Sequence, residues 1–329
     1  MRVGIDVSPL ALTRAGTARH LHGLLPHLDA MPGLELRRLA WGGGGRITAA
    51  LRDVWWYPVG LPRSARGLDV LHCPSFRAPA RSTVPLVVTV HDLAVLRHPE
   101  TFNRWSRVYG RLLVPRVVRS ADRVIAVSEF TRRELVELLG AREDRIRVVP
   151  NAVDDTFSPD GPAVGGDYAL AVGTIEPRKN LTRLFEAMSG LDLDLRVVGA
   201  RGWGEDDVNV GSPRVEWLGR VSDERLAELY RGARVFVYPS LYEGFGIPPL
   251  EAMACGTPVV TSRGGALEEV TGGAAVLVDP LDPAAIRGGI EEALVRCDEL
   301  RAAGLERART FSWASSARAT ADVYRELAR

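Results

Sequence analysis

Two glutamates, Glu243 and Glu251, have seven residues between them in a stretch rich in glycine and proline. The apolar run 235–238 predicts a strand before this stretch, and Pro248 predicts the first turn of a helix within it. Glycines at 244 and 246 would let the backbone approach a ligand, and the N–H groups before the helix would bind an anion. Carboxylates only accept hydrogen bonds, which suits sugar hydroxyls. The residues expected to contact such a ligand are Glu243, Gly244, Phe245, Gly246, Ile247 and Glu251.

Each glutamate also has a simpler interpretation. Glu243 could be a solvated loop residue. Glu251, expected near the first turn of the helix, could stabilise the helix dipole by ~0.3–1 kcal/mol. The combination of both carboxylates with the glycines and prolines favours a binding site.

The only lysine among 42 basic residues is Lys179, and it follows Arg178 just after the apolar run 168–174. Cations between a strand and a helix are typical of phosphate sites in α/β proteins. Arginine can clamp two oxygens, whereas lysine acts as a point charge. We therefore expect Arg178 and Lys179 to bind a phosphate group; the alternative is a surface lysine kept by chance.

Two further candidates lie in the first half of the chain. His91 follows the apolar run 86–90, so we expect it at the carboxyl end of a strand, where it could bond a sugar hydroxyl. The alternative is a structural histidine capped by Asp92. Gly16 lies between the first strand and its helix, which is a usual ligand edge in this class of fold, although plain turn chemistry explains it equally well.

Short apolar runs that alternate with amphipathic helices must position these residues. The pattern predicts an α/β protein with parallel sheets covered on both faces. We expect two Rossmann-like, doubly wound domains that face each other across a cleft: residues 1–158 and 159–311, with a last helix at 312–329 that packs back on the first domain. The predicted strands are 2–7, 34–41, 70–72, 86–91, 123–127, 146–149, 168–173, 195–199, 215–218, 235–238, 259–261 and 275–278. The predicted helices are 17–28, 104–119, 129–139, 180–188, 223–231, 248–254, 283–296 and 312–328. We expect a flexible loop at the glycines 42–45.

Composition limits the functional class. The 329 residues are 46% hydrophobic and 25% charged, as in ordinary soluble proteins, and no apolar run reaches the length of a membrane span. No secretory leader is recognisable, so we expect a cytoplasmic protein. Three scattered cysteines do not suggest disulfides or a zinc site.

Charge is divided unevenly between the halves. Residues 1–150 hold 23 basic and 13 acidic residues, whereas residues 151–329 hold 19 basic and 28 acidic ones. The basic half would suit an anionic lipid surface or a phosphorylated acceptor, and it has no recognisable nucleic-acid module. A predicted helix at 104–119 carries arginines at 104, 107 and 111 beside apolar residues at 105, 108 and 112. This face could lie on the inner face of an anionic membrane or be solvated.

The stretch from Glu243 to Glu251 resembles the Glu-x7-Glu motif of the family 4 retaining glycosyltransferases, which adopt the GT-B fold. The resemblance includes residues 88–93, 149–154, 215–222, 259–269 and 278–280, and covers nearly the whole chain. It implies a nucleotide-sugar donor held mainly by the C-terminal domain and an acceptor held mainly by the N-terminal one. It also implies transfer with retention of configuration, without a metal or another cofactor.

The resemblance implies roles for individual residues. Glu251 would bond the ribose of the donor, and Glu243 would lie beside the hydroxyls of the transferred sugar. Arg178 and Lys179 would hold the diphosphate, and His91 would lie near the reacting sugar. The loop with Gly16 would contact the donor.

One departure concerns the diphosphate. Many members have arginine where this chain has Thr174, so which of Arg178 and Lys179 contacts which phosphate stays open. The sequence Glu-Pro-Arg-Lys-Asn at 176–180 resembles a subgroup rich in mannosyl transfer, which favours GDP-mannose as donor and polysaccharide biosynthesis as setting. The acceptor could be a glycan, a lipid-linked saccharide or a small metabolite.

Other classes fit the same architecture. A nucleotide-sugar epimerase or a phosphorylase on the GT-B fold is the nearest alternative. A nicotinamide-dependent dehydrogenase would need Gly-x-Gly-x-x-Gly after a strand, which no predicted strand shows. A non-catalytic sugar-binding protein would need neither the cation pair nor the glutamate pair.

Overall fold

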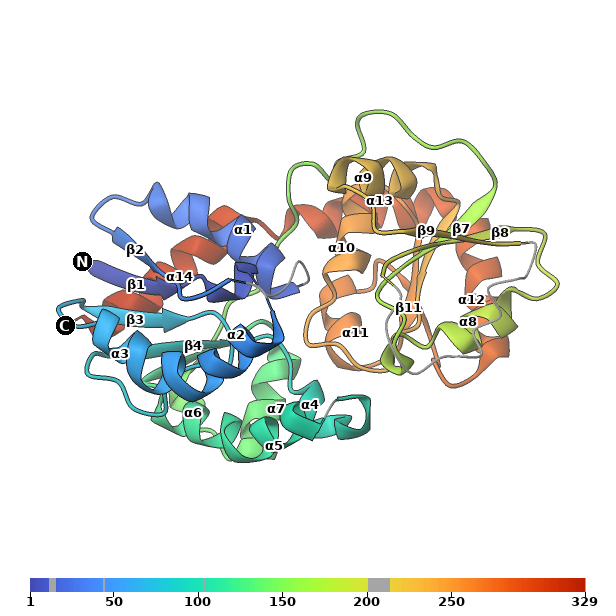
Figure 1. Cartoon of the computed structure of the whole chain (residues 1–329). Helices are drawn as coiled ribbons and strands as arrows, with labels where there is room; N and C mark the ends of the chain where they lie inside the picture. Colours follow the sequence, from blue (N-terminus) through green and yellow to red (C-terminus); the bar gives the residue numbers. More distant parts are fainter. Residues whose placement is uncertain (12–15, 44, 103, 201–213, 329) are drawn as a thin grey trace. The chain divides into compact units, whose positions relative to one another are not determined.

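Two parallel sheets of six strands each organise the chain (Figure 1). The computed structural model describes residues 1–11, 16–43, 45–102, 104–200 and 214–328. Unit 1 comprises residues 1–152 and 312–329, and unit 2 comprises residues 153–311. A strand lies at each of the twelve positions predicted from the apolar runs, with ends that differ by one or two residues. The units divide between Ala152 and Val153, earlier than the expected boundary after residue 158.

The sheet of unit 1 has the order β2-β1-β3-β4-β5-β6, and all of its strand pairs are parallel. All residues of β3 and β4 are buried, as expected for strands covered on both faces. The order reverses between β1 and β3, which makes this the topological switch point of the sheet. The strands are β1 (Arg2–Asp6), β2 (Glu35–Leu39), β3 (Val70–Cys73), β4 (Leu86–Val90), β5 (Arg123–Ala126) and β6 (Ile146–Val148).

Helices and short helical turns connect these strands. The α-helices are α1 (Gly16–Asp29), α2 (Arg46–Leu51), α3 (Leu61–Ser64), α4 (Ala94–Arg97), α5 (Arg104–Leu112), α6 (Val114–Ser120) and α7 (Glu129–Leu139). The 3₁₀ turns are η1 (Ser8–Ala11), η3 (Pro99–Thr101) and η4 (Glu143–Arg145), and η2 (Arg52–Gly60) is a π-helical segment.

The last helix, α14 (Trp313–Leu327), packs on unit 1, where its red ribbon lies beside the blue α1 and β1 in Figure 1. Gly23 of α1 makes room for Trp313, because a Cβ at Gly23 would lie 2.1 Å from the indole ring. Farther along α14, Tyr324 Oη lies 2.6 Å from His72 Nδ1 in the buried interior of the unit. The chain thus returns to the domain in which it began.

Three expectations for unit 1 need correction. The helix predicted at 104–119 is two helices, α5 and α6, because Pro115 lacks an N–H group and is tolerated only in the first turn of a new helix. The segment 46–64, for which no helix was predicted, is helical. The glycine loop before it is partly fixed by hydrogen bonds, because the buried Arg52 donates to the carbonyls of Gly42 and Gly43. Gly44 lies outside the described residues.

The sheet of unit 2 has the order β12-β11-β10-β7-β8-β9, so its switch point lies between β7 and β10. Apolar residues of β7, β8, β10, β11 and β12 form one core with helices α8 and α12. The strands are β7 (Tyr168–Val172), β8 (Asp194–Val198), β9 (Val215–Gly219), β10 (Val235–Tyr238), β11 (Val259–Ser262) and β12 (Val276–Val278). The helices are the turn η5 (Pro177–Lys179), α8 (Leu181–Met188), α9 (Asp223–Gly232), α10 (Ile247–Ala254), α11 (Gly265–Thr271), α12 (Pro283–Val295) and α13 (Cys297–Arg309).

Serine and aspartate caps begin several helices. Ser222 accepts a hydrogen bond from the Arg225 N–H at the start of α9, and Asp282 accepts one from Ala284 at the start of α12. Helices α11 and α13 were not predicted, and α13 has few apolar positions in its sequence. No helix in the described part of the chain is long and apolar enough to cross a membrane.

Candidate active site

The two loops with the strongest candidates lie at the switch point of unit 2. Lys179 closes η5 after β7, and Glu243 lies in the loop after β10. Strands β7 and β10 are parallel neighbours, so both loops leave the same edge of the sheet. A backbone bond from Leu241 N–H to Arg178 O, 2.8 Å long, joins the loops directly. Ligands of doubly wound sheets bind at such a point.

The Glu243 carboxylate accepts hydrogen bonds from four donors. Its Oε1 accepts from Lys179 Nζ at 2.6 Å, Ser240 Oγ at 2.7 Å and Tyr238 Oη at 2.9 Å. Its Oε2 accepts from Arg178 Nη1 at 3.0 Å. With three bonds on one oxygen and one on the other, Oε2 keeps the larger capacity for a ligand hydroxyl.

The electrostatic balance keeps this carboxylate charged. Burial by itself would raise the pKa of Glu243, but Arg178 and Lys179 lower it to about 2. Burial also lowers the pKa of Lys179, which the Glu243 carboxylate opposes. At neutral pH Glu243 is therefore an acceptor and an anchor for two cations rather than a proton donor.

Arg178 is held by a second acid. Its Nη2 donates to Glu176 Oε1 at 2.7 Å, and its Nη1 also donates to the carbonyl of Tyr242 at 2.8 Å. The side chains of Glu176, Arg178, Lys179 and Glu243 are 11–15% exposed. Two cations and two anions thus form a partly buried network of ion pairs.

Asn180 fixes the turn that carries the cations. It has a left-handed backbone with φ 59° and is 2% exposed. Its Nδ2 donates to the carbonyls of Pro239 at 3.0 Å and Pro280 at 2.6 Å. Asparagine tolerates this backbone conformation better than most residues. One side chain therefore holds η5 against the loops that follow β10 and β12.

The loop before α10 presents the expected glycine at its turn. Gly246 has φ 105°, and a Cβ there would lie 2.6 Å from Leu267 Cδ2. Helix α10 begins at Ile247, so Pro248 lies in its first turn as predicted. Phe245 is 5% exposed and its ring packs edge-to-face on Phe311, so contact with a ligand there would have to come from the backbone.

Glu251 is the fifth residue of α10, near its first turn as expected. It is 2% exposed and accepts a hydrogen bond from Tyr230 Oη at 3.2 Å. Hydrogen bonding compensates part of the cost of burying this group. Gly244, Ile247 and Glu251 belong to unit 2, as does Glu243, which precedes them closely in the chain.

His91 and Gly16 belong to unit 1. His91 follows β4, and its Nε2 lies 2.9 Å from the carbonyl of Pro74, to which it donates. Burial lowers the pKa of His91 to about 4, so the ring is neutral at pH 7. The ring of His20 packs edge-to-face on it at 4.9 Å. Gly16 begins α1; residues 12–15 of its loop lie outside the described residues.

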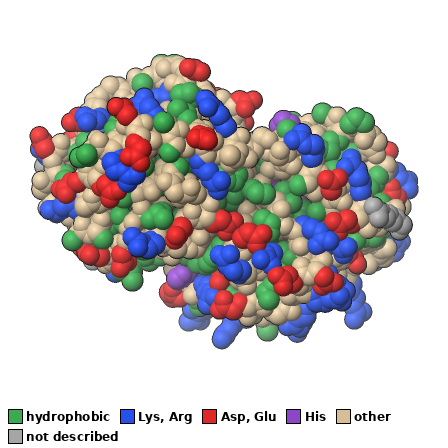
Figure 2. All heavy atoms as spheres, turned by 180° about the vertical axis from the view of Figure 1, so that it is seen from behind, with side chains coloured by type: hydrophobic (Ala, Val, Ile, Leu, Met, Phe, Trp, Pro, Cys, Tyr) green, Lys and Arg blue, Asp and Glu red, His purple; other side chains and the backbone are tan. Residues whose placement is uncertain are grey.

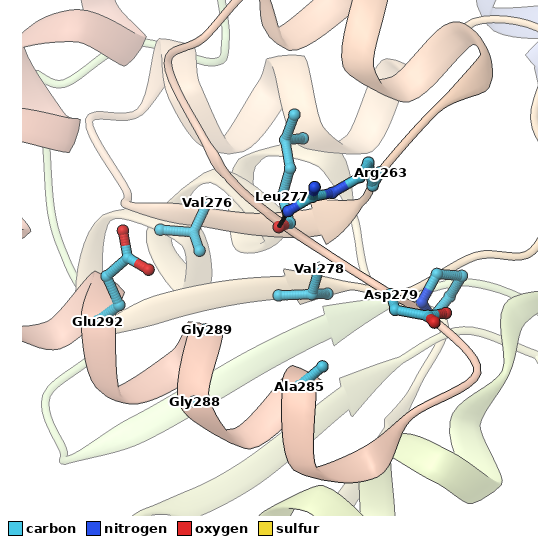
Figure 3. A pocket seen from close by; sticks show the side chains of 10 residues that line it. Arg263, Val276, Leu277, Val278, Asp279, Ala285, Gly288, Gly289 and Glu292 are labelled. Carbon is cyan, nitrogen blue, oxygen red and sulfur yellow. Dashed lines mark hydrogen bonds between the residues drawn. The ribbon is translucent and has the colours of Figure 1, made fainter.

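A separate pocket of about 630 Å³ lies beside β12 and α12. Figure 3 shows Asp279 and Glu292 at opposite ends of it and Arg263 directed toward the backbone of Leu277, whose carbonyl is 3.4 Å from Arg263 Nη2. The described lining residues do not include Arg178, Lys179 or Glu243.

Four polar residues of the network were not singled out from the sequence: Tyr238, Ser240, Glu176 and Asn180. All four lie within motifs that were recognised, at 176–180 and 238–258. The feature of the sequence that could have indicated them is that they lie close to the charged residues of the same motifs. Their contacts between the two loops could not be derived, because these depend on which strands are neighbours.

Comparison with known proteins gives the family. Residues 4–157 match the family model described as Glycosyltransferase Family 4, and residues 154–311 match Glycosyl transferases group 1. The chain is 35% identical to the O-antigen chain mannosyltransferase B of Escherichia coli, over 91% of this chain and 80% of that protein. The chain belongs to the group 1 glycosyl transferases of family 4.

Solved structures agree on the fold. Sucrose-phosphate synthase from Thermosynechococcus elongatus matches 99% of this chain and 98% of its own with a TM-score of 0.80 at 20% identity. Anabaena Alr3699/HepE, solved in complex with UDP and glucose, matches 98% of both chains with a TM-score of 0.76 at 18% identity. The protein is a glycosyltransferase with the two Rossmann-like units of the GT-B fold. Family membership removes the dehydrogenase and the non-catalytic sugar-binding protein from the alternatives.

Proposed function

We propose that this glycosyltransferase moves mannose from GDP-mannose to an acceptor hydroxyl, with retention of configuration and without a metal. The named activity of the Escherichia coli relative supports mannose, as does the Glu-Pro-Arg-Lys-Asn sequence at 176–180. The UDP and glucose bound by Alr3699/HepE support a nucleotide-sugar as donor.

The observation that carries the proposal is the network of Arg178, Lys179 and Glu243 at the switch point of unit 2. When the bond from the anomeric carbon to phosphate oxygen breaks, the departing nucleoside diphosphate gains negative charge. Two fixed cations in a poorly solvated site stabilise that charge without reorganising. They would supply what a divalent metal supplies in other enzymes, with Glu243 as their resting partner.

The proposed transfer is a front-face substitution. The acceptor oxygen bonds to the anomeric carbon on the face that the phosphate leaves, and the acceptor proton passes to the departing phosphate oxygen. Glu243, with a pKa of about 2, stays ionised and orients a hydroxyl of the transferred sugar. His91, neutral at pH 7, would bond a hydroxyl near the reacting carbon rather than serve as a strong base.

The remaining residues would bind rather than react. We propose that Glu251 bonds the donor ribose, that the backbone from Gly244 through Phe245 and Gly246 to Ile247 contacts the donor, and that Gly16 contacts it as well. We further propose a cytoplasmic enzyme of polysaccharide biosynthesis that meets an acceptor glycan, lipid-linked saccharide or small metabolite at the inner face of the membrane.

A panel of nucleotide-sugars without acceptor tests the proposal. We expect slow hydrolysis of GDP-mannose, with release of mannose of retained configuration, to exceed that of UDP- and ADP-sugars. Release of an epimerised nucleotide-sugar, or dependence on inorganic phosphate, would instead indicate an epimerase or a phosphorylase. Arg214→Ala is a suitable control, since Arg214 forms an exposed ion pair with Asp192 in the same unit.

A further inference from the structure

Unit 1 exposes large apolar side chains in two segments. Helix α5 exposes Trp105, Val108 and Leu112, each about half accessible, and the end of α2 with η2 exposes Leu51, Val54 and Trp55. These six are two-thirds of the nine large hydrophobic side chains found exposed in the described part of the chain. Large exposed apolar side chains that gather in one place mark interaction sites, whereas single ones are ordinary.

The two segments are neighbours. Trp105 Nε1 donates to Asp53 Oδ2 at 2.9 Å, so the exposed indole of α5 lies beside η2. Asp53 is buried and also pairs with Arg77, whose guanidinium lies 5.0 Å from the centre of the Tyr109 ring. These contacts dock the Tyr109 side of α5 into the unit.

The side of α5 opposite Gly110 faces outward. Gly110, next to Tyr109, is buried so closely that a Cβ there would lie 2.7 Å from Val95 Cγ2. The residues Trp105, Val108 and Leu112 recur at the three- and four-residue spacing of one helix face. An amphipathic helix normally turns such a row toward the core. Here the side chains of the row stay about half exposed, although Trp105 is also bonded to Asp53 of the same unit.

Positive charge accompanies this row. Residues 101–121 contain five arginines and no acid: Arg104, Arg107, Arg111, Arg116 and Arg119. None of the five forms an ion pair with any carboxylate that the structure describes. Other arginines of the unit do pair: Arg97 with Glu134, and both Arg123 and Arg147 with Glu326. Figure 2 shows basic side chains along the lower edge of unit 1, where Figure 1 places α5, α6 and α7.

A small pocket of about 290 Å³ lies at the margin of this surface. Val95, Leu96 and Pro99 form its apolar part, and Arg107 and Arg111 supply two guanidinium groups. Arginine pairs suit phosphate oxygens, and an apolar floor suits the start of an acyl chain. The combination fits a lipid phosphate better than a free anion, which would gain nothing from the apolar side.

We propose that an anionic lipid bilayer binds the lipid-binding face, defined as Val54, Trp55, Trp105, Val108 and Leu112 with the arginines of α5 and α6. Indole rings favour the membrane–water interface, and basic side chains beside an apolar row favour anionic lipids. A protein partner would have to cover an acid-free segment with acids of its own. The inference concerns unit 1 alone and does not depend on the donor chemistry proposed for unit 2.

Flotation of the full chain with vesicles tests the proposal. We expect binding to vesicles of phosphatidylcholine with roughly 30% phosphatidylglycerol and weak binding to vesicles of pure phosphatidylcholine. On an anionic membrane surface each basic residue contributes ~1 kcal/mol to binding. Arg104→Ser with Arg111→Ser should weaken partitioning about 30-fold, and 0.5 M salt should act in the same direction. Trp105→Ser should weaken binding at both salt concentrations.

The matched control is Arg37→Ser with Arg318→Ser, which removes two exposed arginines of unit 1 outside this face. This control variant should lose only the nonspecific part of the electrostatic attraction, so its partitioning to vesicles should weaken by no more than a few-fold. Equal binding to neutral and anionic vesicles, no binding to either, or equal losses in both double variants would overturn the proposal. Self-association of the wild type that Trp105→Ser abolishes, without vesicle binding, would assign the face to a second copy of the chain. Acceptor-free hydrolysis should be unchanged in every variant, which separates this outcome from failure of the proposed function.

Discussion

Lys179→Met is the most informative single substitution in unit 2. It keeps the aliphatic stem, which lies so close to Gly173 that a Cβ there would be 3.3 Å from Lys179 Cγ, and it removes the ammonium group with its charge and hydrogen bonds. Lys179 Nζ donates to Glu243 Oε1 at 2.6 Å and to Tyr238 Oη at 2.7 Å. Arg178, Tyr238 and Ser240 still satisfy Glu243 in the variant, so the carboxylate keeps three of its four donors.

The expected magnitude follows from the environment of the ammonium group. The Lys179 side chain is only 13% exposed, so solvent screens its charge poorly. A preorganised donor of this kind is worth ~2.7–4 kcal/mol in a transition state, which corresponds to a loss of about 100- to 1,000-fold in kcat. The lost bond to a charged partner should cost ~1.5–3 kcal/mol of stability, which a folded unit tolerates. Lys179→Arg should lose less than Lys179→Met, because it keeps the charge in a different geometry.

The assay is release of GDP from GDP-mannose under single-turnover conditions, with thermal unfolding of each variant measured in parallel. Arg214→Ala serves as control, because its ion pair is exposed and should contribute within ~0–1 kcal/mol. If Lys179→Met unfolds cooperatively yet retains kcat within threefold of wild type, the cation does not stabilise the leaving group and the reasoning is refuted.

Four more predictions concern stability and pH. Glu243→Gln should destabilise the protein by about 2–3 kcal/mol at pH 7, because two partly buried cations lose their counter-charge. Urea unfolding measures this change in stability. A change below about 0.5 kcal/mol, which is ordinary for surface substitutions, would contradict the prediction. The folded pKa of Glu243 is below its unfolded value, so its contribution is complete above about pH 4.5 and is lost as the pH falls toward 2; Glu243→Gln should flatten that part of the stability profile. The pKa of His91 is about 4 in the folded state and 6.5 in the unfolded state, so the unfolded state binds more protons between these values. The free energy of unfolding should therefore decrease as the pH is lowered from 6.5 to 4. An equally steep decrease in His91→Asn would count against this cause. Asn180→Ala should cost about 2–3 kcal/mol, from a strained left-handed backbone and two lost hydrogen bonds, whereas Asn180→Gly should recover the backbone part; equal losses would exclude backbone strain.

The strands and the order of the elements were predictable because β-strands buried on both faces read as short apolar runs. The prediction was wrong where local signals conflict. Segment 46–64 begins after glycines and contains Pro58 and Pro62, which argue against helix, but the buried Arg52 and its carbonyl partners stabilise helical turns there. Helix α13 was missed because most of its residues are charged or small, so its apolar stripe is narrow.

The candidate site was predictable as a set of charges but not as a network. The residues Arg178, Lys179 and Glu243 were chosen for their types and positions at strand ends, and they do lie together. The bonds of Glu243 with Arg178 and Lys179 depend on β7 and β10 being neighbours, whereas its bonds with Tyr238 and Ser240 are local to one loop. That adjacency is a property of topology, which sequence distance does not encode. Their roles toward a donor stay predictions.

Calorimetric titration of GDP in the presence of EDTA tests the central claim most directly, because it asks whether the two cations hold the diphosphate without a metal. We predict that wild type binds GDP equally well, within twofold, with EDTA and with added Mg²⁺. We also predict that Arg178→Ala with Lys179→Met weakens binding by at least ~100-fold, since two charged hydrogen-bond donors are lost. Binding that EDTA abolishes and Mg²⁺ restores, or an affinity of the double variant equal to that of wild type, would contradict the account.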